Sequence, residues 1–436
     1  MRVLFVVWPG DTHLFPVTPL AWALQSAGHE VRIGTHHALA ESITSIGLTP
    51  IGLGDKDVLP MGPGKPYPEA EWERLERVTT ALELGPDERD TWDIFTHYLL
   101  PGVWDFLPLG LGDDQPQPGV DDLVEFARDW QPDLVLWDPL YPAAAVAAAA
   151  CGAAHARLSP WQDYCGWTLD RYNASAAALE LGEHPLVAAL RPAAARHGVE
   201  VNDELLYGQW TIDGLPPGFR LTTTARGVPL RLMQYAAPTA VPEWLRKPPD
   251  RPRVAVSLGL SQRTFMSEED DGWSYLPAVM QALSELDVEV IATLNAVQLA
   301  GLGKLPANVR AVDYVPLNQL LPSCSALIHH GGPGSFTAGA AHQVPQLVMD
   351  SADASIAEKF PTCSATARYV IEQGAGLSLD LKKPSADSIR ERISRVLEEP
   401  SFRAGAARVY NDLQAMPSPV DLVPTLERLT VEHRSR

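Results

Sequence analysis

The sequence has 436 residues, 46% of them hydrophobic and 20% charged, which supplies more than one buried core and excludes a mostly disordered chain. Its 34 Lys and Arg residues face 54 Asp and Glu residues, and the formal net charge of −20 argues against a nucleic-acid binder. A small phosphate site stays open, because backbone N–H groups bind phosphate without net positive charge.

The cysteines are too scattered to form a metal or disulfide framework. Cys151, Cys165, Cys324 and Cys363 include no pair with the spacing of a zinc ribbon. Scattered thiols are typical of a reducing compartment, so we expect a cytoplasmic protein. The apolar runs are also interrupted before they reach the roughly 20 residues of a membrane span, and we expect no membrane partner.

The chain opens with a predicted strand, loop, helix and strand. Residues 3–7 are β-branched and aromatic, which is typical of a buried parallel strand. Thr18 and Pro19 predict the N-cap and first position of a helix that ends at Gly28. A second strand begins over residues 30–34, and this order starts a doubly wound sheet.

The alternation of strands and helices weakens between residues 52 and 118. Gly, Pro and acidic residues with interleaved tryptophans favour helices and long loops there. The alternation resumes with a strand over 133–137, a helix over 143–150 and a strand near 155–158. His155, within that last strand, is interpreted as a core histidine.

A proline-rich segment precedes a second series of strands and helices. Residues 241–252 contain four prolines and little periodicity, which predicts a linker. We therefore expect an N-terminal Rossmann-like domain over 1–240, a C-terminal one over 253–415 and a tail over 416–436 that packs back on the N-terminal domain. In the second half, strands are predicted at 253–258, 288–294, 326–329 and 346–349, and helices at 276–286, 334–342, 385–397 and 402–415.

The segment HHGGPGS (329–335) lies between a predicted strand and a predicted helix. Its glycines let backbone N–H groups approach a ligand closely, and a helix N-terminus adds partial positive charge. Imidazole and Ser hydroxyl groups also donate to phosphate. The alternative to a phosphate site is a glycine-rich turn with incidental histidines. The pattern predicts a diphosphate cradle built by His330, Gly331, Gly332, Gly334 and Ser335.

His13 lies near the carboxyl end of the first predicted strand, where open α/β sheets bind ligands. An imidazole with the ordinary pKa of about 6.5 suits proton abstraction at neutral pH. Asp11 could orient this ring, as could a carboxylate elsewhere. Asp138 follows the strand over 133–137 and either supports His13, binds substrate or caps the next helix. The alternative for His13 is a loop residue without a chemical role.

Further carboxylates have open interpretations. Asp350 and Asp353 follow the strand over 346–349 and either accept hydrogen bonds from sugar hydroxyls or cap a helix. Asp55 and Asp57 have the D-x-D spacing of a Mg²⁺–diphosphate site, but they lie in the other half of the chain and are expected to be solvated. The sequence contains neither G-x-S-x-G nor H-E-x-x-H, which disfavours an esterase or a zinc protease.

Seven segments carry a family likeness over nearly the whole chain. They are THLFPVTPLAW (12–22), AGHEVR (27–32), PDLVLWDP (132–139), GAAHAR (152–157), GQWTID (208–213), VPEWL (241–245) and HHGGPGS (329–335). With these segments the chain resembles GT-B glycosyltransferases of family 1, and among them the deoxysugar transferases of macrolide and anthracycline biosynthesis. The segments at 208–213 and 241–245 resemble the desosaminyltransferase-like branch.

The resemblance implies an α/β protein with two Rossmann-like, doubly wound domains that face each other across a cleft. It implies inverting transfer of a deoxysugar from a dTDP-sugar to a polyketide hydroxyl, without a metal or other cofactor. The acceptor would bind the N-terminal domain and the donor the C-terminal domain. His13 matches the general base; the donor site is matched by His330, Gly332, Gly334, Ser335, Ser257, Gly259, Val315 at the nucleobase and Asp353 near the sugar.

The resemblance also bears on partners and alternatives. Some transferases of this branch need an activator that resembles a cytochrome P450 without haem, and residues 69–108 match its general binding region. Other relatives act alone, and a homodimer is one open state of assembly. Two other functions stay open: a nucleotide-sugar 2-epimerase, and a catalytically idle partner protein built on the same fold.

Overall fold

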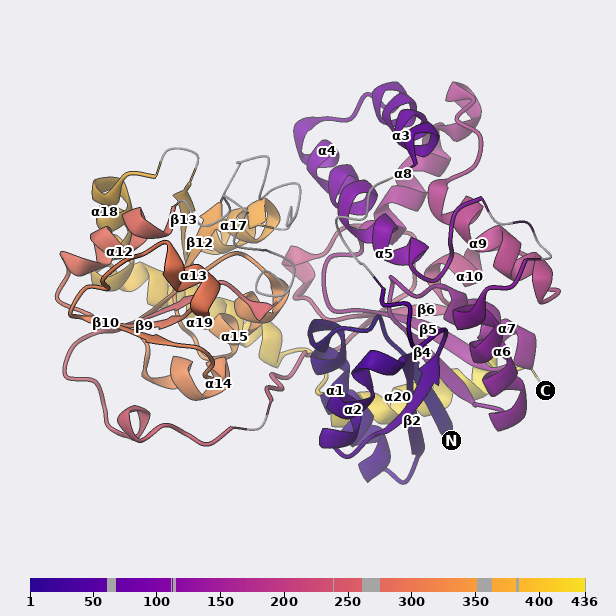
Figure 1. The fold of residues 1–436 in the computed structure, drawn as a ribbon, viewed down its shortest axis with the longest axis horizontal. Helices are drawn as coiled ribbons and strands as arrows, with labels where there is room; N and C mark the ends of the chain where they lie inside the picture. The colour runs from indigo at the N-terminus through magenta and orange to yellow at the C-terminus, as the bar shows by residue number, and fades with distance from the viewer. Residues whose placement is uncertain are drawn as a thin grey trace. The chain divides into compact units, whose positions relative to one another are not determined.

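The computed structural model describes residues 1–60, 68–110, 112, 115–237, 239–260, 275–350, 363–381 and 384–435. The chain divides into two compact units (Figure 1). Unit 1 comprises Met1–Leu215, Phe219–Met233 and Pro417–Arg436, and unit 2 comprises Pro216–Gly218 and Gln234–Met416.

Unit 1 contains a parallel sheet with the strand order β3-β2-β1-β4-β5-β6-β7. The strand order 3-2-1-4-5-6 is that of a doubly wound Rossmann sheet. The central strands β1 and β4 are apolar runs whose side chains are nearly all buried, as expected for a sheet covered on both faces. The strands are β1 (Arg2–Val6), β2 (Glu30–His36), β3 (Thr49–Leu53), β4 (Leu134–Trp137), β5 (Ala154–Ser159), β6 (Trp210–Asp213) and β7 (Gly227–Pro229).

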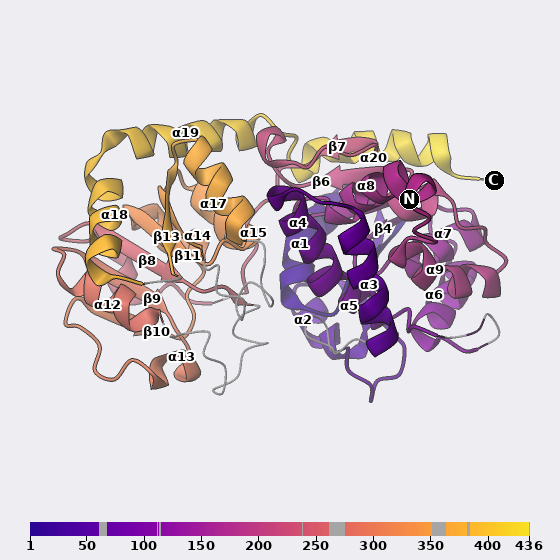
Figure 2. The ribbon, with the colours of Figure 1, turned by 90° about the horizontal axis from the view of Figure 1, so that it is seen from above.

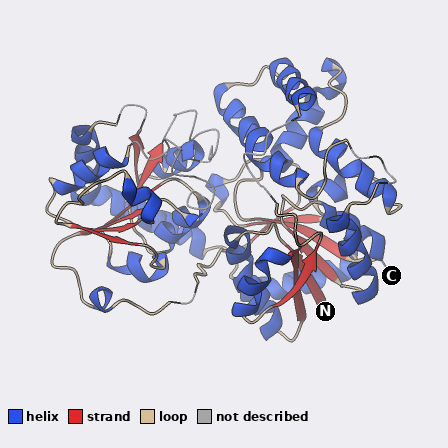
Figure 3. Cartoon of the chain, in the orientation of Figure 1, coloured by secondary structure: helices blue, strands red, loops and turns tan. Residues whose placement is uncertain are grey.

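Helices lie around the strands of unit 1 (Figure 3). They are α1 (Asp11–Ser26), α2 (Ala40–Ser45), α3 (Glu69–Ala81), α4 (Pro86–Asp93), the π-helical turn η2 (Ile94–Leu99), α5 (Leu100–Trp104), α6 (Pro118–Trp130), α7 (Ala143–Cys151), α8 (Tyr164–Leu179), α9 (Pro185–Arg196), α10 (Asp203–Tyr207) and α20 (Pro419–His433). The last helix, α20, packs against α1 and β5. Figure 2 shows this helix in yellow, leading to the C-terminus of the chain.

Unit 2 has a second parallel sheet, in the order β10-β9-β8-β11-β12-β13, which is again the doubly wound order. Its strands are β8 (Arg253–Ser257), β9 (Glu289–Thr293), β10 (Val309–Val312), β11 (Ala326–His329), β12 (Gln346–Asp350) and β13 (Gly376–Asp380). Its helices are α12 (Leu276–Ser284), α13 (Ala296–Ala300), α14 (Leu317–Leu320), α15 (Pro333–Ala341), α17 (Cys363–Glu372), α18 (Ala386–Glu398) and α19 (Pro400–Gln414). The prediction of an α/β fold with two Rossmann-like sheets is confirmed.

The predicted start of the first helix is wrong. The helix α1 begins at Asp11, because Gly10 has an extended backbone and its carbonyl accepts from Leu14 N at 3.0 Å. Thr18 lies inside the helix, where its hydroxyl donates to the Leu14 carbonyl at 2.8 Å instead of capping a terminus. Pro19 is likewise internal and removes one N–H donor from the helix.

Several elements were absent from the sequence prediction. The short strands β6 and β7 and the 16-residue helix α8 lie in a polar stretch without clear periodicity. The segment predicted as a linker also makes local contacts. The Trp244 ring lies 5.9 Å from the Arg253 guanidinium and 5.2 Å from that of Arg310. Within the described ranges, no helix has the combination of length and apolar character that crossing a bilayer requires.

His184 lies in an aromatic cluster at the start of α9. Its Nδ1 accepts a hydrogen bond from Leu186 N at 3.1 Å, so the ring caps the helix. The ring centroid lies 5.3 Å from that of Phe95, 5.0 Å from that of Tyr172 and 6.5 Å from that of Trp92. Burial, assisted by the positive charge of Arg74, lowers the pKa of His184 to about 3.

This lowered pKa makes stability depend on pH. The unfolded chain protonates His184 below about pH 6.5 while the folded chain does not, so the free energy of unfolding falls by about 1.4 kcal/mol per pH unit from this group as the pH drops towards 4. The variant His184→Asn keeps a capping acceptor but does not titrate, and should lose this part of the slope in urea unfolding. His37→Asn, at an exposed histidine, should keep it. Equal slopes in wild type and His184→Asn would contradict the assignment.

Candidate active site

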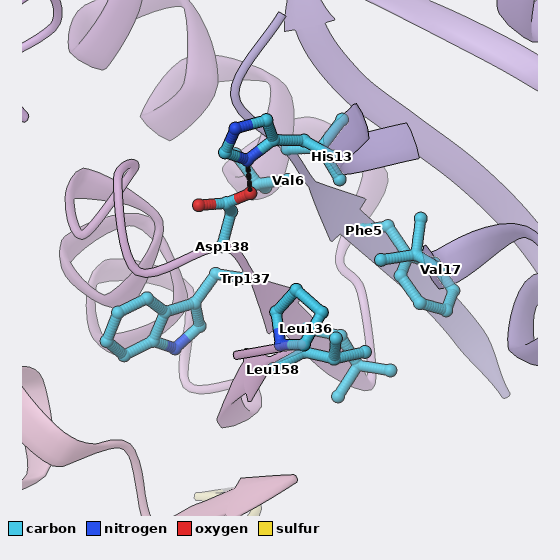
Figure 4. Close-up of a pocket in the computed structure, with 10 residues that line it drawn as sticks. Phe5, Val6, His13, Val17, Leu136, Trp137, Asp138 and Leu158 are labelled. Atoms are coloured by element: carbon cyan, nitrogen blue, oxygen red, sulfur yellow. Dashed lines mark hydrogen bonds and ion pairs between the residues drawn. The ribbon is translucent and has the colours of Figure 1, made fainter. Parts of the chain in front are cut away.

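The carboxyl ends of β1 and β4 bring His13 and Asp138 together. The two strands pair in parallel with Val6 opposite Trp137, and Asp138 N donates to the Val6 carbonyl at 2.9 Å. His13 stands in the first turn of α1, which follows β1 after a short loop. His13 Nδ1 lies 2.6 Å from Asp138 Oδ2 (Figure 4). The structure therefore joins two residues that are 125 positions apart in sequence.

Both side chains of the pair are buried and hydrogen-bonded. His13 is 7% exposed and Asp138 6% exposed, so their hydrogen bond is shielded from water. The second carboxylate oxygen, Oδ1, accepts from Leu140 N at 2.8 Å. An ionised carboxylate only accepts hydrogen bonds, so with Asp138 ionised the donor of this bond is His13 Nδ1, and in the neutral ring Nε2 is then the acceptor. That tautomer is the one a general base requires.

Two tryptophans hold the sides of the imidazole. The ring of Trp8 lies 5.1 Å from that of His13, and the ring of Trp161 lies 5.2 Å away in an edge-on arrangement. Gly10 leaves room for this contact, because a Cβ there would lie 3.0 Å from the Trp8 ring. Neither tryptophan was predicted from sequence as part of the site; each becomes visible only once the strand ends are brought together.

A small cavity lies beside the pair. It measures about 10 Å³, which is about the room of one water molecule. Its lining is mostly apolar and comes from β1, α1, β4, β5 and the residues directly after these strands: Phe5, Val6, Val7, His13, Val17, Leu136, Trp137, Asp138, Leu158 and Pro160 (Figure 4).

Other predictions for unit 1 have mixed outcomes. Asp11 is exposed in the first turn of α1, and the carboxylate bonded to the imidazole is that of Asp138. Tyr98, on the π-helical turn η2, was not predicted: burial and then the charge of Asp138 raise its pKa to about 12. His155 is a buried histidine as predicted, and burial lowers its pKa to about 4.

A second group of predicted residues gathers at the carboxyl ends of β8 and β11 in unit 2. The strands pair with Ser257 opposite His329. The helix α15 starts at Pro333 with Gly332 as its N-cap. The ring of His330 lies against Gly259 and Gly332, and a Cβ at either glycine would overlap it. Gly259 also has φ +75°, a conformation that glycine adopts without strain.

The two histidines of this group are neutral at physiological pH. Burial lowers the pKa of His329 to about 3. Burial also lowers the pKa of His330 to about 4, against a hydrogen bond with the Ser257 backbone that raises it. With neutral imidazoles, the helix N-terminus supplies positive potential at this group. Gly331, Gly332, Gly334 and the buried Ser335 lie at that terminus.

The remaining donor-site predictions differ in their positions. Val315 is buried in an apolar cluster with Ala255, Ile291 and Leu320, so its side chain belongs to the core of unit 2. Asp350 is the last residue of β12. Asp353 lies outside the described residues. In the part of the chain that is described, no three His, Cys, Asp or Glu side chains are grouped to hold a metal ion.

Two Rossmann-like sheets, each with candidate site residues at its carboxyl edge, match the GT-B fold of solved glycosyltransferases, and the relatives of this chain are glycosyltransferases. The chain belongs to the erythromycin biosynthesis protein CIII-like family. The model of the family's N-terminal domain matches residues 22–259, and that of its C-terminal domain matches residues 277–429.

Relatives of known name cover the whole chain. It is 40% identical to the aclacinomycin-T 2-deoxy-L-fucose transferase of Streptomyces galilaeus, over 100% of this chain and 97% of that protein. It is 37% identical to the 3-alpha-mycarosylerythronolide B desosaminyl transferase of Saccharopolyspora erythraea, over 100% and 99% of the two chains. The crystal structure of the glycosyltransferase VinC in complex with dTDP matches with a TM-score of 0.80 and 32% identity, over 99% of this chain and 100% of that one.

The role of the His13–Asp138 pair can be tested by replacing Asp138 and Asp11 one at a time. Asp138→Asn removes the charge that fixes the Nδ1–H tautomer, and should lower kcat by about 10²- to 10⁴-fold. Asp11→Asn alters an exposed carboxylate and should leave kcat near the wild-type value. Steady-state kinetics with saturating donor would decide, and an equal loss in both variants would refute the assignment of Asp138.

Proposed function

We propose that this glycosyltransferase moves a deoxysugar from a dTDP-sugar to a hydroxyl of a polyketide aglycone, with inversion at the anomeric carbon. The observation that carries the proposal is the His13–Asp138 hydrogen bond of 2.6 Å at the carboxyl edge of unit 1. The two named relatives transfer 2-deoxy-L-fucose and desosamine, and VinC binds dTDP, which supports this donor class.

The proposed reaction is a single displacement. His13 Nε2 takes the proton of the acceptor hydroxyl as its oxygen attacks the anomeric carbon. The bond from that carbon to the diphosphate oxygen breaks, and the diphosphate leaves with the electron pair. Attack from the opposite face inverts the configuration. Asp138 stabilises the imidazolium that forms, as the buried carboxylate of a catalytic triad does.

We assign the donor to unit 2. The backbone N–H groups of Gly332, Gly334 and Ser335 would bind the diphosphate at the start of α15 and stabilise the charge that develops on it. His330 and Ser257 would contribute a further donor each. Gly259, Gly331 and the segment around Val315 would surround the nucleotide, and Asp350 and Asp353 would accept hydrogen bonds from the sugar.

The proposal includes no metal ion. Charge on the diphosphate would be stabilised by the helix N-terminus and neutral donors. The D-x-D pair is exposed in unit 1, where Asp55 Oδ1 accepts from Asp57 N at 2.9 Å and so closes a local turn. Addition of a chelator should therefore leave the rate unchanged.

The acceptor, and any activator protein, are assigned to unit 1. Aromatic side chains near His13 suit an apolar polyketide. The tryptophans of residues 69–108 give little support to an activator surface. Trp92 and Trp104 are buried in unit 1, and Trp72 is half-buried. Turnover by the purified chain alone would remove the activator from the proposal.

Replacement of His13 tests the proposed function. His13→Ala removes the base and should reduce turnover by about 10²- to 10⁴-fold, while the Kd for dTDP stays near the wild-type value. His37→Ala, at an exposed histidine, is the control and should change neither quantity. Turnover would be followed by product mass with a panel of dTDP-deoxysugars and macrolide or anthracyclinone acceptors.

Two results would contradict the proposal. Equal loss of turnover and dTDP affinity in His13→Ala would mean that His13 is not the base. Isomerisation of the donor without an acceptor would identify a nucleotide-sugar 2-epimerase instead.

A further inference from the structure

Both backbone groups of Gly331 have buried partners. Its N–H donates to His329 Nδ1 at 3.2 Å. Its carbonyl accepts from the hydroxyl of Thr366, on α17, at 2.6 Å. Gly331 has φ +87°, so the turn from β11 to α15 passes through a conformation that other residues rarely adopt. The turn is therefore held by one local side chain, His329, and by one distant side chain, Thr366.

The contact with Thr366 fixes the direction of the next N–H group. In a trans peptide the carbonyl of one residue and the N–H of the next point in opposite directions. Since the Gly331 carbonyl points to Thr366, the Gly332 N–H points away from α17. Pro333 has no N–H, so the Gly332 N–H is one of the donors at the start of α15 that have no acceptor within the helix.

The helix that carries Thr366 is itself fixed on α15. The rings of Tyr369 on α17 and Phe336 on α15 meet edge-on, with centroids 5.6 Å apart. Both rings are buried, as is Val370. On the strand side, Gln346 Nε2 donates to the Phe336 carbonyl at 3.3 Å. Thr366, only 2% exposed, is thus packed firmly beside the turn.

We propose that Thr366 is a positioning residue for the donor diphosphate: its hydroxyl holds the Gly331–Gly332 peptide so that the Gly332 N–H faces a phosphate oxygen. This inference rests on the proposed donor site at the start of α15. Without the hydroxyl, the Gly331 carbonyl would be buried without this partner, and the peptide would gain freedom to rotate away from the orientation that binds the diphosphate.

The test compares dTDP with thymidine, which has the same base and deoxyribose but no phosphate. Thr366→Val preserves shape and removes the hydroxyl. We expect the Kd for dTDP to rise about tenfold and the Kd for thymidine to stay unchanged, by calorimetry. Thr366→Ser restores the hydroxyl and should bind dTDP within about twofold of wild type. Should Thr366→Val not fold, Thr366→Ala and Thr366→Ser form a second pair that differs by one hydroxyl.

Thr337 offers a matched control in the same unit. It is also 2% exposed, and its hydroxyl donates to the Pro333 carbonyl at 2.6 Å. That carbonyl lies one turn earlier in α15, so Thr337→Val leaves the Gly331–Gly332 peptide untouched. We expect this variant to bind dTDP like the wild type, which shows that removal of a buried hydroxyl is not enough to weaken binding.

The possible failures are distinguishable. Wild-type affinity for dTDP in Thr366→Val would overturn the role of Thr366 and leave the donor site standing. An equal loss for thymidine and dTDP would mean general damage to unit 2 and would also overturn it. If Thr366→Ser lost as much affinity as Thr366→Val, the hydroxyl would not be the cause. Wild-type protein that binds no dTDP would overturn the donor site, and the inference with it.

Discussion

The parallel pairing of the central strands is the constraint on which both groups of site residues depend. Because β1 and β4 run in the same direction, with Val6 opposite Trp137, Asp138 leaves its strand beside the loop that leads to His13. In unit 2, the pairing of Ser257 with His329 sets the β8 loop beside the glycine-rich turn. A shift of one residue in either register would point these side chains to the other face of the sheet.

Histidines have different roles in the two units because their surroundings differ. His13 has a buried carboxylate 2.6 Å from Nδ1, and such a partner stabilises the protonated ring that a base must become. At His329 and His330 burial is the largest influence, and it lowers their pKa to about 3 and about 4. In the proposed reaction, unit 1 therefore accepts a proton, while unit 2 offers neutral donors and a helix N-terminus to the diphosphate.

Much of this arrangement was predictable from the sequence, and the omissions have physical reasons. Buried parallel strands have continuous apolar sequences, so the central strands were predicted. The short strands β6 and β7 have no such pattern. Proline rules misplaced the start of α1, because tertiary packing overrides a lost N–H. His13 was predicted from its place at a strand end, but the choice between Asp11 and Asp138 required the register of the sheet. Thr366 is 35 residues from its partner, and no local pattern marks it.

The most direct test of the donor site in unit 2 is calorimetry with dTDP and UDP on the wild type and on His330→Ala. We expect micromolar binding of dTDP, about −8 kcal/mol at 1 μM, and its loss in His330→Ala. We also expect UDP to bind more weakly than dTDP. Wild-type affinity in His330→Ala, or binding of neither nucleotide by the unaltered chain, would contradict the assignment of the donor diphosphate to the turn between β11 and α15.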